Sequence, residues 1–168
     1  MLREVDPGDL LTFYEHQRDP AACMVAAFTP RELPAFLEHW KTKILGSPTV
    51  IARSILLGGK LAGYVSSFEA EGQRLVCYWI GREFWGGGVA SKALKEFVEK
   101  IERTRPLAAF VATSNPGSIR VLEKCGFVQV PGSVHVGDDG VEEVRFSLSP
   151  RGGEGRGEGG ELTARSSC

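Results

Sequence analysis

The first third of the chain carries hydrophobic residues at helical spacing. Leu10, Phe13 and Tyr14 fall on one face of a helix predicted over residues 7–16. A second helix is predicted to begin at Thr29-Pro30-Arg31-Glu32, which offers a threonine N-cap, a proline in the first helical position and a glutamate three residues after the cap. We therefore expect the amino-terminal region to be helical.

The pattern then changes to that of β-strands. Residues 49–56 and 61–69 are strand-like runs, and Leu57-Gly58-Gly59-Lys60 between them is typical of a tight hairpin. A third run, residues 74–80, follows a turn at Ala70-Glu71-Gly72-Gln73. Because parallel neighbours need a long crossover, strands joined by short turns must be antiparallel.

Helical spacing returns after three consecutive glycines, with apolar residues repeating between Ala90 and Ile101. Residues 107–112 form an apolar run, expected to be a central strand parallel to the strand before that helix. A short helix is predicted from Ser114-Asn115-Pro116 to Gly126, followed by strands over residues 127–130 and 141–148. The expected fold class is α+β, with a mixed, mostly antiparallel sheet.

Composition divides the chain into two parts. The chain has 168 residues, of which 42% are hydrophobic, and a single domain is predicted over residues 1–150. Residues 151–168 are rich in glycine and charge and nearly free of large apolar side chains. Such a segment buries too little surface to offset its ordering entropy, so we expect a disordered tail there.

Charge and cysteine usage exclude several function classes. The formal net charge of −1 gives no reason to expect a nucleic-acid partner. No apolar run approaches the ~20 residues that cross a bilayer, and the first residues do not resemble a signal peptide, so we expect a cytoplasmic protein without membrane attachment. The four cysteines include no C-x-x-C pair and the three histidines are scattered, so no metal site is expected.

The three glycines, Gly86 to Gly88, lie where a strand is expected to pass into a helix. A Walker phosphate loop is excluded because Gly87 and Gly88 occupy the positions of its lysine and its serine or threonine. A dinucleotide fingerprint is excluded by Ser91 in its last position and by the antiparallel hairpins upstream. Two interpretations remain: a tight turn without a ligand, and an anion site in which bare amides at a helix N-terminus hold a pyrophosphate.

Two segments carry a recognisable pattern. The first reads Tyr78-Trp79-Ile80-Gly81-x-Glu83-Phe84-Trp85-Gly86-x-Gly88-x-Ala90. The second, from Asn115 to Phe127, has an asparagine, a serine three residues later and a closing Lys-x-Gly-Phe. These segments resemble the two signatures of the GNAT N-acetyltransferases, especially the RimJ/RimL-like branch. The resemblance covers about residues 49–148.

The resemblance implies a GNAT-like three-layer α/β/α domain that uses acetyl-CoA as cosubstrate and no metal. A primary amine would attack the thioester directly, without an acyl-enzyme. The pantetheine arm would enter between strands 74–80 and 107–113, which this family splays apart. The cofactor-binding residues implied are Tyr78, Trp79, Ile80, Trp85, Gly86, Gly87, Gly88, Val89, Ala90, Asn115 and Ser118.

Individual roles follow from the same resemblance. The amides of Gly86 and Gly88 would hold the pyrophosphate, and an N–H near Trp79 or Ile80 would polarise the thioester carbonyl. Asn115 would contact the pantetheine arm, and Ser118 would lie near the sulfur. From the residues alone, Asn115 is an ordinary N-cap and Ser118 an ordinary polar residue of the first turn.

The sequence departs from the family pattern in three places. Glu83 stands where many members have glutamine or arginine, although an acidic residue is common there in the RimJ/RimL branch. Gly87 replaces a basic residue common in that branch. A tyrosine that some members use as general acid near the second signature is absent, and Phe127 cannot replace it.

The acceptor amine must lose a proton before it attacks. A lysine-type amine is about three pKa units from its free base at pH 7, whereas an α-amine is only about one unit away, so protein N-termini are the easier substrates. Glu69 and Glu71 are candidate bases, and Glu69 is taken as the catalytic one together with Ser118. The alternative interpretation of both glutamates is a solvated hairpin end. Glu38 and His39 are weaker candidates.

Three functions stay open. The first is an acetyl-CoA-dependent N-acetyltransferase acting on a protein N-terminus or a small amine. The second is an antibiotic- or polyamine-modifying acetyltransferase of the same fold, and the third is a non-catalytic acyl-CoA-binding module. The expected partners are acetyl-CoA and an amine acceptor, in a monomer or homodimer. The sequence does not identify the acceptor.

Overall fold

The computed structural model describes residues 1–150, so the predicted disordered tail, 151–168, lies outside the described part. The helical segments are η1 (Pro7–Asp9), α1 (Leu10–Gln17), α2 (Pro20–Ala26), α3 (Leu33–His39), η2 (Trp40–Ile44), η3 (Arg82–Phe84), α4 (Val89–Glu96), η4 (Phe97–Ile101) and α5 (Pro116–Lys124). The strands are β1 (Leu2–Glu4), β2 (Ile51–Leu57), β3 (Lys60–Ala70), β4 (Gln73–Ile80), β5 (Leu107–Ala112), β6 (Val128–Gln129), β7 (His135–Val136) and β8 (Glu142–Leu148).

The strands of the described residues form one mixed sheet in the order β1-β2-β3-β4-β5-β8-β6, with β7 paired to β8. The β2–β3 and β3–β4 hairpins are antiparallel, and β5 is parallel to β4, as the sequence predicted. The sequence did not predict β1 and β7. They are only three and two residues long, too short to produce an alternating pattern.

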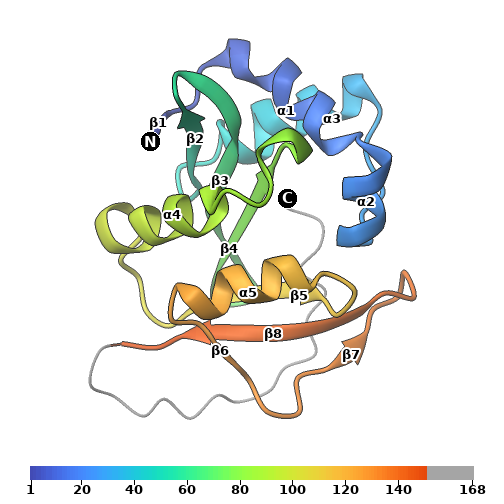
Figure 1. The fold of residues 1–168 in the computed structure, drawn as a ribbon, viewed down its shortest axis with the longest axis vertical. Coiled ribbons are helices and arrows are strands. Elements are labelled where there is room, and N and C mark those ends of the chain that lie inside the picture. Colours follow the sequence, from blue (N-terminus) through green and yellow to red (C-terminus); the bar gives the residue numbers. More distant parts are fainter. Residues whose placement is uncertain (151–168) are drawn as a thin grey trace.

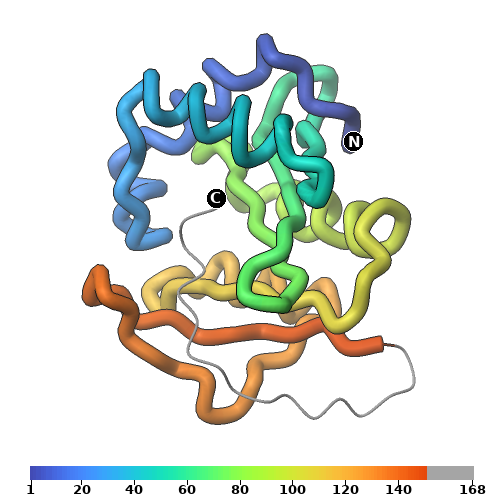
Figure 2. Tube along the Cα trace, turned by 180° about the vertical axis from the view of Figure 1, so that it is seen from behind, coloured from blue at the N-terminus to red at the C-terminus, as the bar shows by residue number. Residues whose placement is uncertain are grey.

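Helices cover both faces of the sheet, which confirms the expected three-layer arrangement. In Figure 1, α4 and α5 lie side by side on the near face, while α1, α2 and α3 gather at the other end and behind β2–β4; Figure 2 shows the second group from behind. The α4–α5 face encloses the larger core, around Phe97, Leu122 and Phe146. The other face encloses a second core around Phe13, Trp40 and Tyr64.

One predicted helix start is wrong. Helix α3 begins at Leu33, after the extended N-cap residue Glu32, and not at Thr29-Pro30. Pro34 explains the shift. A helix starting at Pro30 would place Pro34 in its second turn, where proline lacks the required N–H and its ring clashes with the preceding turn. Starting at Leu33 keeps Pro34 within the first turn, where proline is tolerated.

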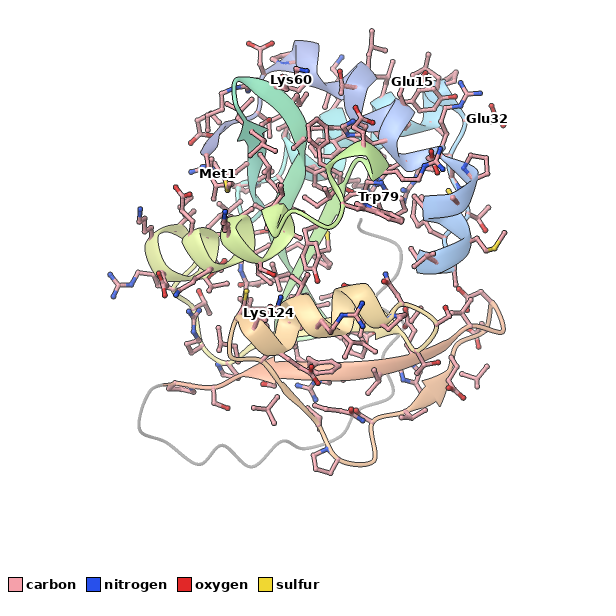
Figure 3. All side chains as sticks on the ribbon, in the orientation of Figure 1. Met1, Glu15, Glu32, Lys60, Trp79 and Lys124 are labelled. Atoms are coloured by element: carbon pink, nitrogen blue, oxygen red, sulfur yellow. The ribbon has the colours of Figure 1, made fainter. Side chains whose placement is uncertain are left out.

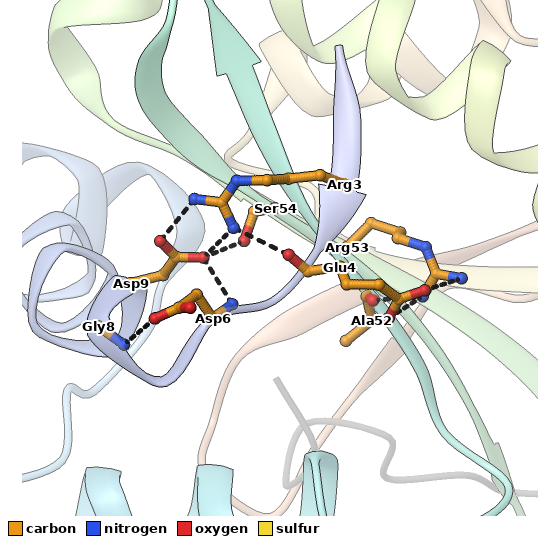
Figure 4. Close-up of polar contacts among 8 residues, drawn as sticks. All are labelled: Arg3, Glu4, Asp6, Gly8, Asp9, Ala52, Arg53 and Ser54. Carbon is orange, nitrogen blue, oxygen red and sulfur yellow. Dashed lines mark hydrogen bonds and ion pairs between the residues drawn. The ribbon is translucent and has the colours of Figure 1, made fainter.

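A polar cluster attaches the first strand to the rest of the domain (Figure 4). The guanidinium of Arg3 donates two hydrogen bonds to the Asp9 carboxylate, at 2.6 and 2.7 Å, and the Ser54 hydroxyl donates a third at 2.6 Å. Burial opposes the charge of Asp9, but these donors outweigh it and lower its pKa to about 2. The cluster joins β1, η1 and β2 through one buried carboxylate.

A second buried carboxylate connects strands β3 and β4 to the segment that follows η4. Glu102 is 1% exposed and accepts hydrogen bonds from the Ser67 hydroxyl, from Arg74 Nε at 2.8 Å and from the Thr104 amide at 2.9 Å. Burial acts against its charge, yet these bonds keep the Glu102 pKa below its usual value. This network fixes β3, β4 and the crossover to β5 at the end where β4 and β5 meet.

Candidate functional site

The site begins where β4 and β5 separate. The two parallel strands are in register only at Leu75 and Ala108, near the start of each strand, and diverge beyond that pair. A cavity of about 140 Å³ lies at the divergence. It is lined by residues of β3, β4, β5, α5, β8 and the end of α2, namely Ala26, Phe28, Phe68, Leu75, Val76, Cys77, Tyr78, Ala109, Phe110, Val111, Ala112, Asn115, Ser118, Leu122 and Glu143.

The three glycines form the loop that enters α4. Gly86 and Gly88 have φ angles of +80° and +74°, a left-handed conformation that glycine adopts without strain. A Cβ added at any of the three positions would meet no atom within 4 Å. No side chain caps the helix start at Gly88. The loop therefore presents bare backbone and open space at a helix N-terminus, which suits a diphosphate.

The free edge of β4 carries two amides that face the gap. The Gly81 amide donates to the Ala62 carbonyl of β3 at 2.9 Å. Because backbone groups alternate between the two edges of a strand, the amide of Trp79 also points toward β3, whereas those of Tyr78 and Ile80 point toward β5. From the sequence, the N–H that polarises the thioester carbonyl could belong to Trp79 or to Ile80. The alternation of backbone groups along β4 favours Ile80, because its amide points toward the gap.

The side chains of the predicted cofactor residues differ in their surroundings. Trp79 is 9% exposed, and its side chain points away from the α4–α5 face (Figure 3). On the opposite face its indole N–H donates to the His16 carbonyl at 3.0 Å, and its ring packs against Phe28. Ile80 and Val89 are buried in the core under α4. These three residues therefore offer a ligand only their backbone, while Trp85, 46% exposed, offers its ring.

Two hydroxyl groups meet inside the cavity. The Tyr78 hydroxyl lies 2.6 Å from Ser118 Oγ, and both residues line the cavity wall below α5. Burial raises the pKa of Tyr78 above its usual value, so its hydroxyl stays protonated. The fold thus supplies, from β4, a tyrosine beside the second signature, where the sequence pattern had none. The spacing of 40 residues hides this pairing in the sequence.

Asn115 adopts the capping geometry that its sequence context predicts. Its side-chain oxygen accepts the Ser118 amide at 3.1 Å and so caps α5. Asn115 also lines the cavity, and its side-chain NH2 group can still donate hydrogen bonds to a ligand there.

Glu69 lies apart from this group. It is exposed at the end of β3 and lines a second cavity of about 410 Å³, together with His39, Lys43 and Thr49. Phe68, its neighbour, lines both cavities. The structure therefore does not bring Glu69 into the cavity that holds Ser118. Glu71 lies exposed in the β3–β4 turn, with a φ of +50°.

A different carboxylate lines the first cavity. Glu143, on β8, is 4% exposed and was not singled out from the sequence. Along β8, Val144 and Phe146 face the core under α5, so Glu143 faces the opposite side of the sheet. From the sequence alone that face reads as solvent-exposed, because nothing local indicates that residues Ala26 to Phe28 and β7 lie near it.

Within residues 1–150, no group of three or more histidine, cysteine, aspartate or glutamate side chains is arranged to hold a metal ion. In the same range, no helix is long and apolar enough to cross a membrane. Neither observation adds a ligand to the site beyond those that the glycine loop and the cavity suggest.

Comparison with known proteins places this geometry in a family. Residues 1–128 match the family described as the acetyltransferase (GNAT) domain. No curated protein matches the chain. Among solved structures, a GNAT-family acetyltransferase from Bacillus anthracis aligns with a TM-score of 0.71 at 18% identity, covering 88% of this chain and 93% of the other.

Two further structures were solved with coenzyme A. A spermidine N-acetyltransferase from Vibrio cholerae, in complex with CoA and spermine, aligns with a TM-score of 0.72 at 20% identity, covering 88% of this chain and 94% of that one. An aminoglycoside acetyltransferase in complex with coenzyme A aligns at 0.67 and 20%, with the same coverage. The split sheet, the glycine loop and the family match agree: the chain belongs to the GNAT family of acetyltransferases.

Proposed function

We propose that the protein is an acetyl-CoA-dependent N-acetyltransferase of the RimJ/RimL-like branch that acetylates a primary amine. The observation that carries the proposal is the cavity between β4 and β5. Its wall includes Tyr78 and Ser118 on the α4–α5 side and Phe28 and Glu143 on the other side. A cavity that is lined by residues from both faces of a sheet suits two substrates that approach from opposite sides.

The residues present fit the diphosphate and the acyl group of acetyl-CoA. The amides of the Gly86–Gly88 loop would hold the diphosphate, and Trp85 and Ala90 would flank it. The Ile80 amide would donate to the thioester oxygen, in the manner of an oxyanion hole. Asn115 would contact the pantetheine arm. Acetyl-CoA would supply the activated acetyl group.

Ser118 and Tyr78 would act on the leaving sulfur. Their hydroxyls, 2.6 Å apart, would donate a hydrogen bond to the thiolate as it departs. A thiol of roughly pKa 8.5 leaves without full protonation, so this contribution is modest. The sequence-based hypothesis gives the proton of the amine to Glu69, which would have to act through water from the adjoining second cavity.

Release of free CoA, measured with acetyl-CoA and a panel of N-terminal peptides, polyamines and aminoglycosides, tests the proposal. We expect turnover on one of these amine classes. Calorimetric binding of CoA without turnover on any acceptor would instead identify an acyl-CoA-binding module. Absence of CoA binding would overturn the proposal altogether.

A further inference from the structure

We infer that Glu143 is the group that receives the proton of the acceptor amine. The inference rests on the proposed function and names the base of that reaction. It assigns to β8 a role that the sequence pattern suggested for Glu69 and Glu71 at the β3–β4 hairpin.

The position of Glu143 places it in the same cavity as the proposed sulfur-binding pair. Glu143 pairs in register with Ala112, the last residue of β5, and both line the cavity. Ser118 and Tyr78 line it from the α5 side. Among the lining residues of the described chain, Glu143 is the sole carboxylate, whereas Glu69 belongs to the other cavity.

The surroundings of Glu143 suit a cationic amine. The cavity wall on its side is aromatic, with Phe28, Phe68 and Phe110. A carboxylate in such a low-dielectric wall attracts an ammonium ion more strongly than a solvated carboxylate does. The amine therefore arrives charged, binds the carboxylate, and passes its proton to Glu143.

The step balances as a single acyl transfer. The ammonium ion passes one proton to a carboxylate oxygen of Glu143, and the freed nitrogen lone pair forms the bond to the acetyl carbon. The second proton, which the nitrogen loses as it becomes an amide, passes to the departing sulfur, which is released as the CoA thiol. The carbon–sulfur bond breaks, and its electron pair leaves with the sulfur. The protonated Glu143 then returns its proton to solvent before the next cycle.

Two basic side chains accompany Glu143 on its side of the sheet. His135 Nε2 lies 3.8 Å from Glu143 Oε2, and His135 and Glu143 are register partners between β7 and β8. Arg145, two residues along β8, faces the same side of the sheet. A competing interpretation gives Glu143 only a structural role, holding β7 against β8, and the experiment must separate the two.

The test compares Glu143→Gln with one matched control, Glu142→Gln on the opposite, exposed face of β8, and with Glu69→Gln, the competing base in the second cavity. Using the acceptor that the panel identifies, we expect Glu143→Gln to lower kcat/KM at pH 7 by about 100-fold. CoA affinity, measured by calorimetry, should stay within about twofold of wild type. The control Glu142→Gln should change kcat/KM by less than about threefold. Glu69→Gln tests the competing assignment of the base and should lose far less kcat/KM than Glu143→Gln.

The pH profile separates a base from a structural residue. If a carboxylate takes the proton, wild type reacts with the ammonium form of the amine, so its kcat/KM should vary little between pH 7 and the pKa of the amine. The Glu143→Gln variant has no base at this position and reacts only with amine that is already unprotonated in solution. Its kcat/KM should therefore rise about tenfold per pH unit up to the pKa of the amine. Binding of the acceptor to the CoA complex, followed by calorimetry, should weaken about tenfold in this variant only.

Three results would overturn the inference. The first is a pH profile of kcat/KM for Glu143→Gln that runs parallel to that of wild type. The second is a loss of CoA affinity in Glu143→Gln, and the third is a large loss of kcat/KM in Glu69→Gln but not in Glu143→Gln. If wild type turns over an acceptor while Glu143→Gln matches it, the inference fails and the proposed function stands. If wild type acetylates no member of the panel, both fail.

Discussion

The hydroxyls of Tyr78 and Ser118 show how single residues from distant parts of the chain make one functional group. Tyr78 comes from β4 and Ser118 from the first turn of α5, and their oxygens lie 2.6 Å apart. In a buried setting, each hydroxyl orients the other. If the pair serves the departing sulfur, removing either hydroxyl should cost nearly as much as removing both.

This coupling gives a prediction at the residue scale. Tyr78→Phe and Ser118→Ala should each lower kcat about tenfold, and the double variant should lose little more than either single variant, because the two hydroxyls act as a unit. The measurement is a double-mutant cycle on kcat, with KM for acetyl-CoA followed in parallel. Additive losses would show that the two residues act independently.

At the scale of elements, the Asp9 cluster gives a pH dependence of stability. Asp9 has a folded-state pKa of about 2, below the ordinary value of 3.8. A lowered folded-state pKa contributes stability that is present above pH 4 and lost as the pH falls toward 2. The contribution at neutral pH is about 2 kcal/mol, since one pKa unit corresponds to about 1.4 kcal/mol.

Asp9→Asn should therefore reduce the free energy of unfolding by about 2 kcal/mol at pH 7. Its difference from wild type should shrink as the pH falls from 4 to 2. Urea unfolding at both ends of this range provides the measurement. Asp6→Asn, which alters a nearby exposed carboxylate, is the control. A difference between Asp9→Asn and wild type that stays constant with pH would contradict the assignment of the stability to the charge of Asp9.

The elements also show what local sequence can predict. Strand β5 has the predicted bounds, because its apolar run is bounded by proline and polar residues. The predicted start of α3 is wrong because residues 29–32 have the composition of a helix cap, whereas Pro34 decides where the helix can begin. Glu143 could not be found from the sequence, since its burial depends on α2 and β7, which are far from it in the chain or too short to predict.

At the scale of the whole molecule, the arrangement combines two half-sheets joined at one register pair, Leu75 and Ala108. The Glu102 network holds the strands together near that pair, so the divergence opens only toward the other end. The glycine loop stands on one face of the sheet and Glu143 on the other. The family signatures assign a role to the first face, because the contacts proposed there are made by contiguous backbone. The face proposed for the acceptor is assembled from separate elements, so no contiguous sequence pattern identifies it.

The central claim is that bare backbone at Gly86–Gly88 holds the diphosphate of acetyl-CoA. Calorimetric titration of CoA into Gly88→Asp tests it most directly, with Gly58→Asp as the matched control. Both glycines have positive φ and open space around them, so both substitutions add the same charge and similar backbone strain. We predict that Gly88→Asp weakens CoA binding more than tenfold, or about 1.4 kcal/mol, while Gly58→Asp leaves it within about twofold of wild type. Equal CoA affinity in wild type and Gly88→Asp would contradict the account.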